Sequence, residues 1–279
     1  MSKVQLFVTC LVDLFRPEAG IAAVQVLERA GVTVEFPEAQ TCCGQFSYNA
    51  GFKPEAAALA RHWVATFEST EGPIVALSGS CAAMVIHSYP ALLAEDAQER
   101  GEPEAAAARW RERAAAVAQR VWEWSQWVRD HVPPLAGPKP APGPVVACHL
   151  GCHMRRLLKE TQAPRAVLED RGVAVREPVH AEECCGFGGT YSMTEPVVST
   201  ALADAKLTAL DALRAEGAVC LTGADLGCLL HLEGRWRRRG VTFPVRYLAE
   251  VVDAAETGHW QDFSPPSAPL SPPRSQARS

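Results

Sequence analysis

The chain has 279 residues, of which 48% are hydrophobic and 21% charged, and its formal net charge is −5 at pH 7. This composition is that of a globular protein with ample core, and the acidic balance argues against nucleic acid or an anionic membrane as the main partner. No apolar run approaches the ~20 residues that span a bilayer, and the N-terminus lacks a signal-peptide pattern. We therefore expect a cytoplasmic protein without a transmembrane segment.

The first part of the chain predicts alternating strands and helices. The expected order is strand, helix, strand, helix, strand, at residues 4–8, 17–29, 32–36, 54–68 and 74–77. Pro17 suits the first turn of its helix and Gly31 the stop. Strands that alternate with helices are typical of βαβ units with a parallel sheet. We predict an α/β fold.

The middle of the chain predicts a long helix and then a linker. Residues 103–131 are rich in alanine and arginine and carry three tryptophans near their end. We interpret them as one amphipathic helix that packs its aromatic side on a neighbouring layer, with a partner-docking surface as the alternative. Six prolines follow within residues 133–144, which no helix or central strand accepts. We predict a first domain at 1–132 and a linker at 133–144.

The second part repeats the first. Strands and helices are expected at residues 145–148, 164–170, 173–176, 196–213 and 218–221, followed by a loop and helix that open at Cys228. The last sixteen residues hold five prolines and five serines, which is typical of disorder. We predict a second domain at 145–260 and a disordered tail at 261–279. The fold class is thus two tandem, duplicated, Rossmann-like βαβ domains with parallel sheets.

Ten cysteines need an explanation. In a reducing cytosol, metal binding or catalysis explains them better than disulfides. Two adjacent pairs, Cys42-Cys43 and Cys184-Cys185, are each followed by glycine, and neighbouring thiolates can face one metal cluster. An offset of 142 residues relates Cys42 to Cys184, Cys43 to Cys185, and also Cys10 to Cys152. A constant offset indicates duplication of one thiolate-rich site.

Each repeat supplies four matched candidate ligands. They are Cys10, Cys42, Cys43 and Cys81 in the first repeat, and Cys152, Cys184, Cys185 and Cys228 in the second. Thiolates are soft ligands that suit iron–sulfur clusters and zinc, and four is the usual number for a cubane cluster or a structural zinc. The long gaps favour iron–sulfur in at least one repeat over the close cysteine pairs usual in zinc sites. Zinc in one or both repeats stays open.

Further residues near these sites have two interpretations. We interpret Cys220 as a small core residue, and Cys148 as either a core residue or a ligand. Three histidines lie near the second site in sequence, namely His149, His153 and His231. Each either has a structural role with its hydrogen bonds satisfied, or donates a hydrogen bond to a cluster sulfur or shuttles a proton. Gly186-x-Gly188-Gly189 lacks the spacing of a dinucleotide motif, and no Walker A sequence is present.

The motifs together resemble the CCG, or cysteine-rich domain, family. That family includes the cluster-bearing CCG subunit of heterodisulfide reductase and the iron–sulfur subunits of glycolate and anaerobic glycerol-3-phosphate dehydrogenases. The resemblance covers roughly residues 3–250 and is more specific to the lactate-utilization members. The segments that carry it are Thr9–Asp13, Gln40–Gln45, Ser78–Met84, Cys184–Thr190 and Gly227–His231.

The resemblance implies a cytoplasmic component of a three-protein system that oxidises L-lactate to pyruvate. This component would carry electrons through iron–sulfur clusters of the 4Fe-4S class, beside a ferredoxin-like B-type and a C-type lactate utilization protein. The broader family pattern ends each unit in C-x-x-C, whereas Met84 and His231 replace the last cysteine here. The resemblance therefore implies metal ligation by four cysteines in each repeat of this chain. The alternatives are a heterodisulfide-reductase-like or glycolate-oxidase subunit, and a zinc-binding scaffold without catalysis.

Overall fold

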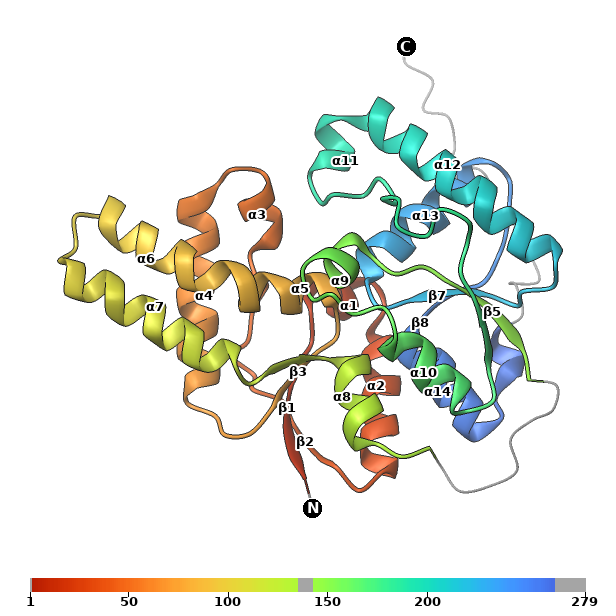
Figure 1. Cartoon of the computed structure of the whole chain (residues 1–279), viewed down its shortest axis with the longest axis horizontal. Helices are drawn as coiled ribbons and strands as arrows, with labels where there is room; N and C mark the ends of the chain where they lie inside the picture. The colour runs from red at the N-terminus through yellow and green to blue at the C-terminus, as the bar shows by residue number, and fades with distance from the viewer. Residues whose placement is uncertain (1, 135–142, 264–279) are drawn as a thin grey trace, which may run out of the picture.

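The computed structural model describes residues 2–134 and 143–263, and within them two four-stranded parallel sheets (Figure 1). The first sheet has the order β2-β1-β3-β4 and consists of β1 (Lys3–Phe7), β2 (Thr33–Glu35), β3 (Ile74–Ala76) and β4 (Val121–Glu123). The second has the order β6-β5-β7-β8 and consists of β5 (Val145–Cys148), β6 (Ala174–Arg176), β7 (Leu221–Gly223) and β8 (Val245–Tyr247). The identical strand orders confirm the predicted duplicated α/β fold. We call β1 to α8 the first half and β5 to η2 the second half.

Helices connect the strands in both halves. Those of the first half are α1 (Cys10–Phe15), α2 (Pro17–Arg29), α3 (Gln45–Asn49), α4 (Lys53–Glu68), α5 (Gly79–Ala83), the π-helical turn η1 (Met84–Ser88), α6 (Tyr89–Glu99), α7 (Glu104–Ala118) and α8 (Trp124–His131). Those of the second half are α9 (Cys152–Arg156), α10 (Ala163–Glu169), α11 (Tyr191–Thr194), α12 (Pro196–Ala215), α13 (Leu226–Arg238), α14 (Leu248–Thr257) and the 3₁₀ turn η2 (Trp260–Phe263). No helix among the described residues is long and apolar enough to cross a membrane.

Backbone hydrogen bonds show which residues of the two halves are equivalent. Gln5 N donates to Pro73 O at 2.8 Å in the first sheet, and Ala147 N donates to Cys220 O at 2.9 Å in the second. Equivalent residues of β1 and β5 therefore differ by 142 in number, and those of β3 and β7, with the loops that follow them, differ by 147. This alignment makes Ser78 the equivalent of Asp225.

The prediction of one helix over residues 103–131 is wrong. Helix α7 ends at Ala118, and β4 then pairs with β3 through Ile74 and Val121. Glu123 ends the strand and begins α8, because its carboxylate accepts hydrogen bonds from Ser125 N at 2.8 Å and Gln126 N at 3.3 Å. Apolar residues recur at helical spacing on both sides of the three-residue strand, so the sequence gives no sign that the helix is interrupted there. Residues 121–123 are extended only because they pair with β3. The tryptophans do pack inward, and Trp124 is fully buried.

Other predicted elements lie within a few residues of the observed ones, as α2 does at residues 17–29. The strand predicted at 218–221 lies instead at Leu221–Gly223, so that Cys220 precedes it. Most of the predicted linker lies outside the described residues, and so does the predicted tail from residue 264 on. The predicted domain boundaries stay predictions.

The two halves share one hydrophobic core. Helices α2 and α8 of the first half pack against α14 and α10 of the second (Figure 1). Arg29 of α2 binds Asp253 of α14 at 2.7 Å and Glu256 at 2.9 Å. Arg171, after α10, binds the same Glu256 at 2.6 Å, and both side chains are 3% exposed. A buried carboxylate with two guanidinium partners is well compensated, so this network holds the halves in a defined orientation.

Candidate metal centre

The eight predicted cysteines lie at the carboxyl ends of strands. In the first half Cys10 begins α1 after β1, the Cys42-Cys43 pair follows β2, and Cys81 lies in α5 after β3. The second half places its four cysteines in the same way, after β5, β6 and β7. Carboxyl ends of parallel strands meet at one edge of a sheet, where ligands of open α/β folds bind. Each half therefore brings its four cysteines together, as expected.

The thiols of the first half form two close pairs. Cys10 Sγ lies 3.5 Å from Cys42 Sγ, and Cys43 Sγ lies 3.3 Å from Cys81 Sγ. These separations are far longer than the ~2.05 Å of a disulfide, and all four cysteines are free. The Gly44 N–H donates to Cys42 Sγ at 3.4 Å. Four free thiols in two close pairs suit a set of metal ligands better than a redox disulfide.

The second half repeats this arrangement around its own pair. The Gly186 N–H donates to Cys184 Sγ at 3.3 Å, as the Gly44 N–H does in the first half. Both glycines have positive φ, +77° and +89°. A side chain there would be strained, and a Cβ on Gly186 would lie 2.3 Å from Ser199 O. The glycine after each pair is thus required for the turn that aims an N–H at sulfur.

The thiols of each set differ in acidity. Hydrogen bonds from Cys10 and Cys43 lower the pKa of Cys42, and those from Cys152 and Cys185 lower the pKa of Cys184. The deeper thiols have the opposite tendency: hydrogen bonding to Cys184 and to Cys228, together with burial, raises the pKa of Cys185. Each adjacent pair thus favours the thiolate at its first cysteine and the protonated thiol at its second. A bound cation would favour the thiolate at both cysteines of the pair.

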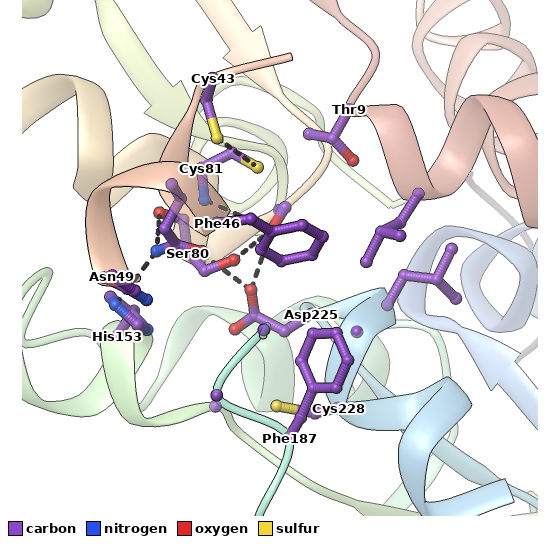
Figure 2. Close-up of a pocket in the computed structure, with 18 of the residues that line it drawn as sticks. Thr9, Cys43, Phe46, Asn49, Ser80, Cys81, His153, Phe187, Asp225 and Cys228 are labelled. Atoms are coloured by element: carbon purple, nitrogen blue, oxygen red, sulfur yellow. Dashed lines mark hydrogen bonds between the residues drawn. The ribbon is translucent and has the colours of Figure 1, made fainter. Parts of the chain in front are cut away.

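All eight cysteines line a single cavity between the two halves. Its wall also contains Phe46 and Phe187, whose rings meet edge to face at 5.8 Å. Figure 2 shows Asp225 beside this pair of rings, with its carboxylate directed toward Ser80 of the opposite half. The sequence predicted two matched sites and missed that they face each other. The duplication was the one available signal, because two similar halves commonly pack about an approximate two-fold axis.

Asp225 is the central residue of this interface. Its Oδ1 accepts a hydrogen bond from Ser78 Oγ at 2.9 Å and another from Ser80 N at 2.7 Å. Ser78 and Asp225 occupy equivalent positions, each three residues before the last cysteine of its set, so the two copies bond to each other. Asp225 is 4% exposed, and burial raises the pKa of its carboxyl. Its role was not predicted from the sequence, although an N-cap residue type three positions before the last cysteine was a usable signal.

A second hydrogen-bond chain crosses between the halves. Gln45 Nε2 lies 3.1 Å from Ser80 O and 3.1 Å from His153 Nε2. Since a carbonyl oxygen needs a donor, the Gln45 amide nitrogen must face Ser80 O, and its other hydrogen then points at His153 Nε2. His153 Nδ1 consequently carries the proton and points toward Cys152 Sγ at 3.5 Å. A residue of the first half thereby orients a donor toward a thiol of the second.

The remaining candidates lie outside the cavity wall. Cys148 and Cys220 are buried, and burial raises the pKa of Cys148 to about 12, so both are inert core thiols in this structure. Met84 is a core residue at 2% exposure. His231 Nε2 lies 3.3 Å from Ser199 Oγ. His149 is buried, which lowers its pKa to about 3 and keeps its ring uncharged.

The family of the chain follows from the fold and these cysteines. The model of the CCG cysteine-rich domain matches residues 4–86 and 146–233, one copy on each sheet. The chain therefore belongs to the CCG cysteine-rich domain family.

Known proteins of similar sequence carry a more specific name. The lactate utilization protein A of Bacillus thuringiensis (strain Al Hakam) and that of Bacillus cereus (strain AH187) are each 41% identical to this chain over 253 residues. The matches cover 90% of this chain and 99% of each relative. A crystal structure of a hypothetical protein from Helicobacter pylori matches 94% of this chain with a TM-score of 0.61 at 12% identity. This chain spans 50% of that protein, and the likeness concerns the fold alone.

Proposed function

We propose that this protein is an iron–sulfur electron-transfer component of a system that oxidises L-lactate to pyruvate. The observation that carries the proposal is the pair of matched four-cysteine sets around one cavity. The name of its relatives, lactate utilization protein A, supports the metabolic role. We place it in the cytoplasm as a subunit of an oxidoreductase complex, with a ferredoxin-like B-type and a C-type lactate utilization protein as partners.

The residues present fit a thiolate-bound cluster. Each set offers four cysteines, the usual number for the 4Fe-4S class, which in one or both halves would supply one-electron steps that couple to a two-electron oxidation. Zinc in one half is compatible with the same donors. The ligands would be the eight cysteines of the two sets, namely Cys10, Cys42, Cys43, Cys81, Cys152, Cys184, Cys185 and Cys228.

The surroundings of the thiols would adjust the reduction potential. N–H groups of Gly44 and Gly186 point at Cys42 and Cys184 and withdraw electron density from sulfur, which favours the reduced state. The rings of Phe46 and Phe187 form part of the cavity wall and would limit the access of water to a bound centre. These residues would hold and insulate a redox centre without themselves exchanging electrons.

Metal and sulfide content test the proposal directly. Protein purified without oxygen should be brown, contain iron and acid-labile sulfide in near-stoichiometric amounts, and change its EPR spectrum on reduction. Colourless protein that contains zinc and no sulfide would contradict the electron-transfer function. It would support the alternative of a zinc-binding scaffold without catalysis.

The shared cavity favours one second candidate, a thiol–disulfide reductase of the heterodisulfide type. Both cysteine sets flank the same space, so a disulfide bound there would be within reach of either. Reductive cleavage of a disulfide substrate by the isolated chain, supplied with electrons from a low-potential donor, would support this function. A chain that carries clusters and shows no such turnover supports the relay function instead.

A further inference from the structure

One of the positions at which the two halves differ lies at the end of the first strand of each, beside the cysteine sets. Phe7 ends β1 and, by the offset of 142, corresponds to His149 after β5. Phe7 packs edge to face against Trp63 at 5.3 Å and Phe67 at 5.7 Å, as a core residue should. The second half has an imidazole where the first has a phenyl ring.

His149 lacks the partners that a structural histidine has. It is 2% exposed, and neither Nδ1 nor Nε2 has a hydrogen-bond partner in the part of the chain that the structure describes. Buried polar side chains are nearly always satisfied, and leaving two ring nitrogens unpaired is unfavourable. His153 and His231, in the same half, each have a partner within 3.5 Å. A ligand that supplies the missing interaction is therefore expected at His149.

The neighbours of His149 indicate what that ligand is. One of its ring nitrogens and the sulfurs of Cys185 and Cys228 all lie within 4.8 Å of one another, the only such group found among residues 2–134 and 143–263. Metal–nitrogen and metal–sulfur bonds of about 2.0 and 2.3 Å put the ligand atoms of a tetrahedral site about 3.5 to 3.8 Å apart. A shift of about 1 Å in these side chains would close the site. An uncharged imidazole already has a free lone pair.

We infer that His149 is a nitrogen ligand to metal in the second half, so that the two halves are different metal sites. The first half offers thiolates alone, and the second offers imidazole together with the thiolates of Cys185 and Cys228. The metal is a thiophilic ion that also accepts imidazole, either zinc or an iron of a cluster. The inference rests on the cysteine sets being metal sites, whichever metal fills them.

X-ray absorption of the full-length protein, at both the zinc and the iron edge, tests this inference. The wild-type spectrum should contain a nitrogen scatterer at about 2.0 Å beside sulfur at about 2.3 Å. His149→Phe gives the second half the residue that the first half carries. It should remove the nitrogen scatterer and roughly half of the bound metal. The matched control, His231→Phe, changes a partnered histidine of the same half and should keep both.

The outcomes separate this inference from the proposed function. Nitrogen at the zinc edge without any iron supports the His149 site and contradicts electron transfer, whereas nitrogen at the iron edge supports both. An all-sulfur shell in the wild type, or unchanged nitrogen and metal content in His149→Phe, overturns the inference. If His149→Phe does not fold, as judged by circular dichroism, His149→Gln is measured in the same way. The ligand atoms seen around the metal in the wild-type spectrum then decide the inference.

Discussion

Replacing Asp225 by alanine should loosen the contact between the two halves. The carboxylate Oδ1 accepts from Ser78 Oγ at 2.9 Å and from Ser80 N at 2.7 Å, and the side chain is 4% exposed. Alanine leaves the Ser80 N–H without this acceptor, whereas the Ser78 hydroxyl keeps Ser80 Oγ as a partner at 2.9 Å. An unsatisfied buried group costs about 1–3 kcal/mol, so we expect Asp225→Ala to lower the free energy of unfolding by about 1–3 kcal/mol.

Asp225→Asn separates hydrogen bonding from charge. The asparagine carbonyl can accept from the same two donors, and the substitution removes a carboxyl whose pKa is raised by burial. We therefore expect the free energy of unfolding to stay within about 1 kcal/mol of wild type, because the lost charge was poorly solvated. Asp13→Ala, at an exposed position, is the control and should change it by less than about 0.5 kcal/mol.

The measurement is urea unfolding of metal-free protein, followed by tryptophan fluorescence and circular dichroism. Metal is left out because binding to the folded state alone would add to the apparent stability. Trp124 and Trp127 lie in the core shared by the halves, so fluorescence reports on that region. If Asp225→Ala is no less stable than Asp225→Asn, the hydrogen bonds across the interface do not stabilise it and the reasoning fails.

Three further predictions concern the cysteine pair, its glycine and a buried acid. Cys184→Ser should abolish the EPR signal of any cluster in the second half, whereas Cys220→Ser, outside the cavity, should keep it; a signal retained in Cys184→Ser would contradict the ligand assignment. Gly186→Ala should destabilise the protein by about 2–4 kcal/mol in urea unfolding, because φ is +89° and the Cβ would lie 2.3 Å from a backbone oxygen of α12. Gly31→Ala, with φ +77° and no atom within 4 Å of its Cβ, should cost about 1 kcal/mol, and equal losses would refute the steric argument. Burial raises the pKa of Glu123 to about 8, so the folded state binds a proton that the unfolded state has released, and stability should fall between about pH 4.5 and pH 8. In Glu123→Gln this fall should shrink, and parallel pH–stability curves for the two proteins would show that Glu123 ionises normally.

Local patterns in the sequence were sufficient to predict most of the secondary structure. Helix α2 begins at Pro17 and ends near Gly31 because both residues act on their own turn, without help from distant parts of the chain. The prediction of a helix at residues 121–123 was wrong for the opposite reason. Their strand exists only through pairing with β3, and no local signal distinguishes it from the helices on either side.

The sequence by itself also determined the composition of each cysteine set. The constant offset of 142 made the two sets copies of one another, and duplication of sequence implies duplication of local structure. It also established that each set lies after strands, since alternation of strands and helices places loop residues at the carboxyl edge of a parallel sheet.

Only the tertiary structure decided how the two copies are combined. Packing of the halves brings both sets to one cavity and pairs Ser78 with Asp225, two equivalent residues that lie 147 positions apart. It also left His149 without a partner beside Cys185 and Cys228. Such contacts depend on the relative orientation of the two halves, which is set by long-range burial of surface and by ion pairs between the halves such as Arg29–Glu256.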